Sequence, residues 1–179
     1  MAPTLTRRSL FASLAAVALA GEARAASTLP DLGLAPEFTG LERWYNSAPL
    51  AMAGLRGRVV LVDFWTHECI NCIHTLPHVL AWDRDFRAQG LTIVGVHTPE
   101  FDRERVAANV EAAIAHWGIR YPVAQDNSFA TWKAWRNQYW PALYLVDRRG
   151  RIRYRHFGEE DYDVTEAAIR ALLAEPARM

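Results

Sequence analysis

The chain of 179 residues has few cysteines, no net charge and no long apolar run beyond its first 25 residues. Its two cysteines, Cys69 and Cys72, are too few for the multi-disulfide scaffold of a small secreted domain. Basic and acidic side chains both number 20, so we do not expect a nucleic-acid-binding protein, which needs a positive surface. Apolar residues make up 51%, which excludes a disordered chain and predicts one globular domain.

The first 25 residues have the three parts of a bacterial secretory signal. Arg7 and Arg8 form the charged start, residues 10–20 are almost entirely apolar, and residues 23–25 fit a small-x-small cleavage site. The apolar run is shorter than the roughly 20 residues of a membrane span. The arginine pair predicts the twin-arginine route, with an ordinary secretory signal as the alternative. Cleavage would leave 17 basic and 19 acidic side chains, and we expect a periplasmic protein that is not integral to the membrane.

The predicted organisation is a signal peptide (1–25), a leader (26–36), one domain (37–175) and a short tail (176–179). Continuous apolar, β-branched runs predict strands that are buried on both faces; these are residues 58–65, 91–98 and 141–147. Further short strands are expected within 37–56 and 121–125. Residues 151–157 alternate apolar side chains with arginines, which predicts a half-exposed edge strand with solvated arginines.

Helical spacing of apolar residues predicts helices between these strands. They cover residues 70–88, 102–117 and 128–138, and a last helix is capped by Asp163 and runs to about 175 with Ala167, Ile169, Leu172 and Leu173 inward. Pro77 should kink the first helix, and Gly90 should stop it. Strands separated by helices indicate an α/β fold whose sheet has a parallel portion.

Cys69 and Cys72 lie where the strand 58–65 gives way to a helix. A cysteine at a helix N-terminus forms a thiolate readily, because free N–H groups and the helix dipole stabilise its charge. Cys69 is therefore the predicted nucleophile, and Cys72, one turn further on, is the predicted resolving thiol. The alternative is a static disulfide, which would close too small a loop to stabilise the chain much.

Three histidines flank the pair, which leaves a metal site as an alternative. His67, His74 and His78 could join the two thiolates around zinc or copper, as in a metallochaperone. No second CxxC or HxxxH pair is present to close a zinc ribbon, and Ile73 follows Cys72 where the haem-attachment motif requires histidine.

The stretch 60–77 (V-L-V-D-F-W-x3-C-x2-C-x4-P) resembles the active-site segment of thioredoxin. Within it, Asp63, Trp65 and Pro77 match the buried aspartate, the tryptophan and the kinking proline of that family, and Pro141 matches its cis-proline. Five stretches, of which the first, 64–79 (FWTHECINCIHTLPHV), overlaps this segment and two others are 94–101 (VGVHTPEF) and 137–147 (NQYWPALYLVD), resemble the exported thioredoxin-like domain of the DipZ proteins, within the TlpA-like group. The resemblance covers roughly residues 35–175. It implies a three-layer thioredoxin-like fold with a central mixed sheet, an N-terminal strand extension and an inserted helix–strand segment.

The resemblance also implies roles for single residues. Asp63 would accept the proton of Cys72, or would be a carboxylate held only by structural hydrogen bonds. Pro141 would follow a cis peptide and present neighbouring backbone to a substrate peptide. Trp140, Trp65 and Glu68 are the candidate substrate-binding residues. Glu68 would raise the pKa of the Cys69 thiol or simply be solvated; the aromatic rim Trp140, Trp132, Trp135 and Tyr139 could equally be core, and His97 and Glu100 are weaker candidates near the site.

The predicted function is exported thiol–disulfide oxidoreductase activity on protein thiols and disulfides, with no cofactor beyond the Cys69–Cys72 disulfide. A membrane electron donor of the CcdA type would restore the dithiol. Departures from thioredoxin at Glu68, Ile70-Asn71 and Trp140 leave the reduction potential and the direction of electron flow open. A peroxiredoxin-like thiol peroxidase is a further alternative, for which Thr66 fits the motif P-x3-[ST]-x2-C but Val62 replaces its proline.

Overall fold

The computed structural model describes residues 29–176, so the predicted signal peptide lies outside the described residues. The strands are β1 (Arg43–Tyr45), β2 (Val59–Trp65), β3 (Leu91–His97), β4 (Val123–Gln125), β5 (Ala142–Val146) and β6 (Ile152–Phe157). The helices are α1 (Ile70–Phe86), α2 (Ala107–Trp117), α3 (Ala130–Ala134) and α4 (Tyr162–Ala174). Short 3-10 helices are η1 (Met52–Leu55), η2 (Arg87–Gln89) and η3 (Asp102–Arg105).

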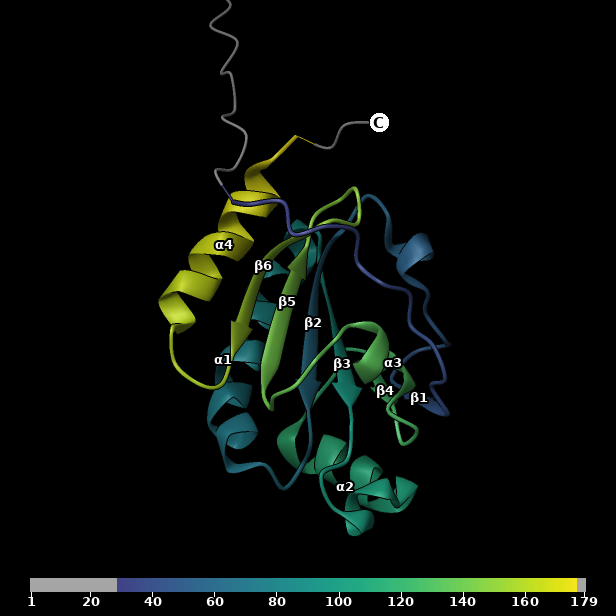
Figure 1. Cartoon of the computed structure of the whole chain (residues 1–179). Helices are drawn as coiled ribbons and strands as arrows, with labels where there is room; N and C mark the ends of the chain where they lie inside the picture. Colours follow the sequence, from purple (N-terminus) through teal and green to yellow (C-terminus); the bar gives the residue numbers. More distant parts are fainter. Residues whose placement is uncertain (1–28, 177–179) are drawn as a thin grey trace, which may run out of the picture.

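The six strands form one mixed sheet in the order β1-β4-β3-β2-β5-β6 (Figure 1). β2, β3 and β4 run parallel, whereas β1, β5 and β6 are each antiparallel to their neighbour. All seven residues of β2 are buried, as its continuous apolar run predicts for a central strand. Asp63 and Trp65 lie in the C-terminal half of this strand, and the CxxC segment follows its C-terminal end.

Two apolar clusters fill the layers on either side of the sheet. One packs the sheet against buried residues of α1, α2 and α4 and includes Cys72. The other packs it against α3, η1 and the segment that leads into the domain. The predicted three-layer thioredoxin-like fold with a mixed sheet is therefore confirmed. Within 37–56, however, the structure has one strand, β1, and the helical turn η1 instead of several strands.

Two of the predicted helices are shorter than their apolar spacing suggested. The predicted helix 102–117 divides at Val106, whose extended backbone separates η3 from α2. Glu104, in η3 before this division, is fully buried. The predicted helix 128–138 contracts to α3, which starts where the Asp126 carboxylate accepts hydrogen bonds from the N–H groups of residues 130–132.

The predicted cap of the last helix was wrong by two residues. Asp161, in a left-handed conformation, precedes α4, and Asp163 lies in its first turn. Ala168 faces the core together with Ile169 and Leu172, while Ala167 is exposed.

The prediction of solvated arginines on β6 was wrong for Arg153, which is buried. Its guanidinium makes ion pairs with Asp147 at 3.1 Å and Glu175 at 3.4 Å and donates to the backbone oxygens of Leu29 and Pro30. Residues 32–35 also pair with the chain beside β6, through the hydrogen bonds from Leu32 N to Ile152 O and from Ile152 N to Gly33 O. The described part of the leader segment thus pairs with the chain at the start of β6, one of the two edge strands of the sheet.

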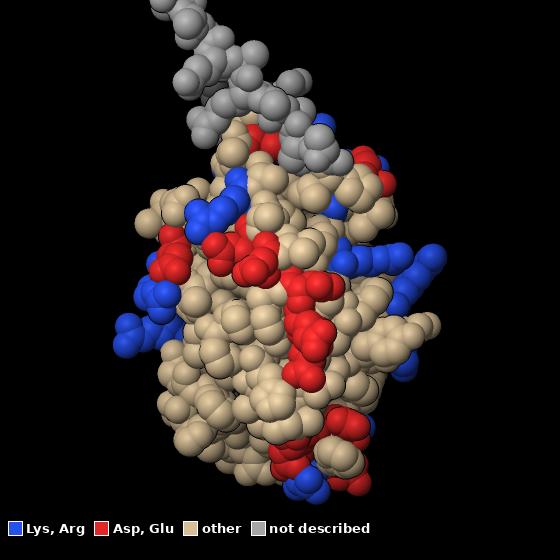
Figure 2. All heavy atoms as spheres, turned by 90° about the vertical axis from the view of Figure 1, so that its left-hand side faces the viewer, with Lys and Arg blue, Asp and Glu red and all other residues tan. Residues whose placement is uncertain are grey.

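The charges, balanced in number, are unevenly spread over the surface. Figure 2, which views the molecule from the α4 side, shows acidic side chains running in a broken band across this face. Glu159, Glu160 and Asp161 lie in the connection from β6 to α4, and Asp163 lies in the first turn of α4. This face offers no continuous positive surface to a phosphate backbone.

Candidate active site

The two cysteines form a disulfide at the N-terminus of α1. Their Cα atoms are 5.2 Å apart, and Cys69 takes the N-cap position of the helix. The N–H of Cys72 donates to the Cys69 sulfur at 3.2 Å, so the sulfur accepts the bond that a capping side-chain oxygen accepts in other helices. Cys69 is partly exposed and Cys72 is buried. A thiolate on Cys69 would therefore be reachable by a substrate and stabilised by the helix terminus.

Asp63 lies on β2 on the face that packs against α1. It is 3% exposed, and its Oδ1 atom has no hydrogen-bond partner within residues 29–176. Burial raises the pKa of this carboxyl from 3.8 to about 7, because the charged form loses its hydration. A carboxyl with such a pKa can accept a proton near neutral pH and release it again.

The peptide bond between Trp140 and Pro141 is cis, as the resemblance implies. Pro141 is buried just before β5, whose residue Ala142 pairs with Phe64 of β2. The Trp140 indole donates to the backbone oxygen of Thr98 at 3.0 Å and packs on Trp132, with ring centroids 4.2 Å apart. The strand pairing and these contacts tie the Trp140–Pro141 segment to the ends of β2 and β3.

The predicted aromatic rim divides between core and surface. Trp132 and Trp135 are buried in the apolar cluster on the α3 side, Trp140 is half-buried, and Tyr139 is exposed. Trp65 also lies in the core, within the cluster that holds Cys72. Ile70, between the cysteines, is exposed, and Trp140 packs against the same cluster as Cys69. The exposed Tyr139 packs on Phe157 of β6.

Glu68, for which the sequence left two interpretations, is in an ion pair. Its carboxylate contacts the guanidinium of Arg103 from η3, and its side chain is about a quarter exposed. It is therefore neither a free like charge beside Cys69 nor a fully solvated group. Arg103 compensates the negative charge next to the nucleophile.

Sequence reasoning missed Glu104, which fixes the turn before Cys69. One carboxylate oxygen accepts from the N–H of Glu68 at 3.1 Å, and the other accepts from those of Glu100 and Phe101 at 2.6 and 2.8 Å. Glu100 itself is exposed and takes part only through its backbone. The short acidic–basic run 102–105 reads as an ordinary solvated helix turn, so no local signal marks Glu104 as buried.

His97, the last residue of β3, lies against the same turn. Its Nε2 is 3.2 Å from the Thr66 hydroxyl and 3.0 Å from Nδ1 of His67. Burial, with a smaller effect from the neighbouring His67, lowers the pKa of His97 to about 3, so the ring is neutral near pH 7. The structure thus brings His97 to the site, where it supports residues 66–67.

The other histidines of the metal alternative point elsewhere. His74 contacts Glu159 at 2.8 Å, and His78 stacks on Tyr162 with ring centroids 3.6 Å apart. Across residues 29–176, no group of three or more His, Cys, Asp or Glu side chains is placed to hold a metal ion.

A partly exposed and a buried cysteine at a helix start, a buried carboxyl and a cis-proline together define a thioredoxin-like thiol–disulfide oxidoreductase site. The chain belongs to the AhpC/TSA family, whose profile matches residues 33–155. It is 47% identical over 151 residues to Protein DipZ of Mycobacterium tuberculosis, covering 83% of this chain but 22% of that protein. The chain thus spans about a fifth of the length of this relative.

Two shorter proteins match along most of their length. The thiol-disulfide oxidoreductase YkuV of Bacillus subtilis is 28% identical, with 78% of this chain and 94% of YkuV covered. The crystal structure of a thiol-disulfide isomerase from Corynebacterium glutamicum superposes with a TM-score of 0.68 at 26% identity, covering 83% of this chain and 99% of that one. Similarity therefore extends over the whole domain as well as the CxxC.

Proposed function

We propose that this protein is an exported thiol–disulfide oxidoreductase that reduces or exchanges disulfides in other proteins through Cys69 and Cys72. The observation that carries the proposal is the disulfide itself, placed at a helix N-terminus with one sulfur accessible and the other buried. A structural disulfide has no need of this asymmetry, whereas a two-step exchange reaction does.

The reaction begins with the dithiol. The Cys69 thiolate attacks one sulfur of a substrate disulfide, a mixed disulfide forms, and the other substrate sulfur leaves as a thiolate. Cys72 gives its proton to Asp63 and attacks the Cys69 sulfur. The second substrate sulfur leaves, and the Cys69–Cys72 disulfide is formed. The substrate has gained two electrons, and the protein has lost two.

The segment around Pro141 is the proposed docking site for the substrate chain. Proline has no N–H, and an extended peptide can pair with the backbone next to it. Trp140 and the exposed Ile70 would contact the residues around the substrate cysteine. Trp65 would support the site by packing in the same apolar cluster as Cys72. Glu68 would support it through its ion pair with Arg103.

We further propose that the protein works in the periplasm after cleavage near Ala25, and that a CcdA-type membrane protein returns electrons to the disulfide. Support comes from the signal-like residues 1–25 and from the similarity to DipZ. In the described part of the chain, no helix is long and apolar enough to cross a membrane. No cofactor other than the cysteine pair is part of the proposal.

Trapping of the mixed disulfide tests the proposed function. The protein with Cys72→Ser is expected to accumulate a covalent complex with a disulfide-bonded substrate, visible on a non-reducing gel and released by dithiothreitol. The matched control, Cys69→Ser, should form little complex because the remaining thiol is buried. Equal trapping by both variants, or by neither, would contradict the proposed roles.

The match to the AhpC/TSA profile favours one second candidate, a thiol peroxidase. One observation argues against a peroxidase. Arg103, which lies close to the CxxC segment, is in an ion pair with Glu68 and is not left to assist the thiol. Peroxide consumption by the reduced protein distinguishes the two functions, and we expect it to be no faster than that of an unassisted thiol.

A further inference from the structure

Four large apolar side chains near β6 are exposed to solvent. Leu32 and Leu34 of the leader are 43% and 63% exposed, Tyr139 is 53% exposed and Phe157 is 39% exposed. Single exposed apolar side chains are normal, whereas several that form one surface indicate a binding site. The four residues come from three segments of the chain, so the contacts between these segments decide whether they form one surface.

The contacts of Phe157 join β6 to the segment before Pro141. Phe157 pairs with Ala142, and Arg155 pairs with Tyr144, across β5 and β6. Ala142 and Tyr144 lie in the apolar cluster on the α3 side, and paired residues share a face of the sheet. The Tyr139 ring packs on the Phe157 ring with centroids 5.4 Å apart, and the Arg155 guanidinium lies 5.7 Å from the Phe157 centroid. These side chains therefore form one continuous surface.

A hollow of about 330 Å³ at the start of β6 joins the two leucines to this surface. Tyr144, one of its lining residues, also packs on Phe157, with ring centroids 5.9 Å apart. We call the surface made of Leu32, Leu34, Tyr139, Arg155 and Phe157 the β6 strip. The residues that line the hollow include Leu32, Leu34, Pro36, Tyr144, Ile152 and Arg155.

Two arginines give the hollow a positive charge. Arg136, which follows α3, lines it together with Arg155. Within residues 29–176, neither guanidinium is in an ion pair, whereas the neighbouring Arg151 is bound by Asp31. An acidic side chain of a partner could therefore bind Arg136 and Arg155 without breaking an existing ion pair. Tyrosine, phenylalanine and arginine are also the residue types enriched at protein interfaces.

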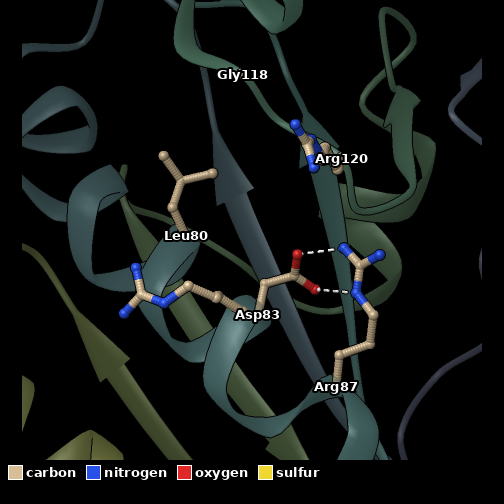
Figure 3. Close-up of a pocket in the computed structure, with 6 residues that line it drawn as sticks. Leu80, Asp83, Arg87, Gly118 and Arg120 are labelled. Atoms are coloured by element: carbon tan, nitrogen blue, oxygen red, sulfur yellow. Dashed lines mark hydrogen bonds and ion pairs between the residues drawn. The ribbon is translucent and has the colours of Figure 1, made fainter.

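A second hollow, at the far end of α1, lacks this combination. Figure 3 shows the carboxylate of Asp83 bound by Arg87, with Arg120 on the same side of the hollow. The large apolar side chain that lines it, Leu80, is half-buried. Its positive charge is thus partly compensated, and it offers little exposed apolar surface.

The β6 strip ends at the redox site. The N–H of Gly158, next to Phe157, donates to the backbone oxygen of Pro141 at 2.9 Å. From Phe157 back to Ile152, β6 spans roughly 17 Å at about 3.4 Å per residue. An extended partner chain that docks at Pro141 would therefore reach the hollow about five residues further along.

The charges differ between the two ends of the β6 strip. Glu159 and Glu160 follow Gly158 at the end near Pro141, whereas Arg136 and Arg155 lie at the hollow. Acidic residues directly beside the cysteine of a partner would be repelled by these glutamates. Acidic residues some distance along the partner chain would be attracted by the arginines.

We propose that the β6 strip is a second docking surface for the protein that exchanges with the Cys69–Cys72 pair. The partner is a protein segment that carries an apolar side chain and acidic residues at least about five residues from its reactive cysteine. The apolar side chain enters the hollow beside Leu32 and Leu34, and the acidic residues bind Arg136 and Arg155. The inference rests on the proposed function and names the class of substrate that the same site selects.

Three synthetic peptides test this selection on the reduced protein. Each carries one cysteine as a mixed disulfide with thionitrobenzoate, whose release is followed by absorbance. The first has a leucine and glutamates about six residues from the cysteine, the second has lysines in place of the glutamates, and the third has serines throughout. The second-order rate constant should be about 10-fold higher for the glutamate peptide than for the serine peptide, which corresponds to about 1.4 kcal/mol. The lysine peptide should react no faster than the serine peptide, and equal rates for all three would overturn the proposal.

Substitutions in the β6 strip should act on the glutamate peptide alone. Leu34→Ala and Arg155→Ala should each lower its rate constant about 3–5-fold and leave the rates with the serine peptide and with hydroxyethyl disulfide unchanged. Arg155→Glu should reverse the preference, so that the lysine peptide reacts faster than the glutamate peptide. A similar loss with every substrate would indicate a structural effect and would overturn the proposal.

Arg120→Ala is the matched control for charge. It removes the same charge from an exposed position on the hollow of Figure 3, at the far end of α1. It should leave all the rates unchanged. If it slowed the glutamate peptide as much as Arg155→Ala does, the net charge of the protein would explain the preference, and the β6 strip would not.

Sedimentation velocity at the assay concentration tests whether a second copy of the chain covers the β6 strip. We expect a monomer; a dimer that Leu34→Ala dissociates would overturn the proposal. The failure of the inference is distinguishable from that of the proposed function. If Cys72→Ser traps a substrate but the three peptides react alike, only the second docking surface fails. If no peptide is reduced and nothing is trapped, the proposed function fails.

Discussion

Replacing Asp63 with asparagine should stabilise the oxidised protein at alkaline pH. The asparagine side chain has nearly the same shape as the aspartate but no charge to desolvate. The folded-state pKa of Asp63 is about 7, against 3.8 for an aspartate in water. Between these two values the native state binds the proton more tightly than the unfolded state does. The free energy of unfolding therefore decreases as the pH rises from 4 to 7.

The magnitude follows from the difference between the two pKa values. A shift from 3.8 to about 7 corresponds to about 4 kcal/mol at 1.36 kcal/mol per unit. At pH 8 the whole of this cost is present in the wild-type protein and absent from Asp63→Asn, so the variant should be more stable by up to about 4 kcal/mol. At pH 4 the wild-type carboxyl is mostly protonated when folded, and the two proteins should differ little.

The assay is urea unfolding of the disulfide-bonded protein at pH 4 and pH 8, so that the thiols do not titrate. Asp147→Asn is the matched control with the opposite sign. Hydrogen bonds from the backbone of Arg151 and from Arg153 hold the pKa of Asp147 below its usual value despite burial. This variant should lose stability mainly at pH 8. Equal or lower stability of Asp63→Asn at pH 8 would show that hydrogen bonds stabilise the Asp63 carboxylate, and would refute the reasoning.

Three further substitutions probe the surroundings of the disulfide. Glu104→Ala should destabilise the protein by roughly 2–3 kcal/mol in urea unfolding, because it leaves the N–H groups of residues 68, 100 and 101 without their acceptor; a loss below about 0.5 kcal/mol would count against this anchor. Gly95→Ala should cost about 1–3 kcal/mol, because its Cβ would lie 3.0 Å from Trp65 Nε1, and unchanged thermal unfolding would contradict this. Arg103→Ala should move the pH profile of Cys69 alkylation upward, because Glu68 then lies uncompensated near the thiolate; added salt should reduce the shift, and a downward shift would argue against the ion pair.

The central strands and the first helix could be predicted to within about two residues. β2, β3 and β5 are continuous apolar runs, and such runs need no knowledge of their neighbours to be recognised. α1 ends through η2 at Gly90, whose φ of +103° suits the residue predicted to stop it. The positions of Cys69, Cys72 and Asp63 followed from these elements. The local sequence pattern therefore located the reactive residues, although it could not show how deeply each side chain is buried.

What could not be predicted depends on contacts between distant segments. Arg153 alternates with apolar residues like its neighbours, yet it is buried because Asp147, Glu175 and the backbone of residues 29–30 provide its partners. Glu104 interrupts the expected helix 102–117 because its carboxylate binds backbone groups of two loops. In both cases a charged side chain with typical surface neighbours is buried, because long-range partners offset the cost of desolvation.

The same reasoning distinguishes the two kinds of buried carboxylate near the disulfide. Glu104 is surrounded by three N–H donors and holds the turn that leads to Cys69. Asp63 has one oxygen without a hydrogen-bond partner in the described residues and pairs with Gly95, which the Trp65 indole nitrogen, also without a partner there, approaches. A fully bonded carboxylate fixes geometry, whereas an unpaired one can exchange a proton at low cost because neither of its states is strongly preferred at neutral pH. Division of these tasks between two residues lets the site keep the nucleophile in place while the resolving thiol changes its protonation state.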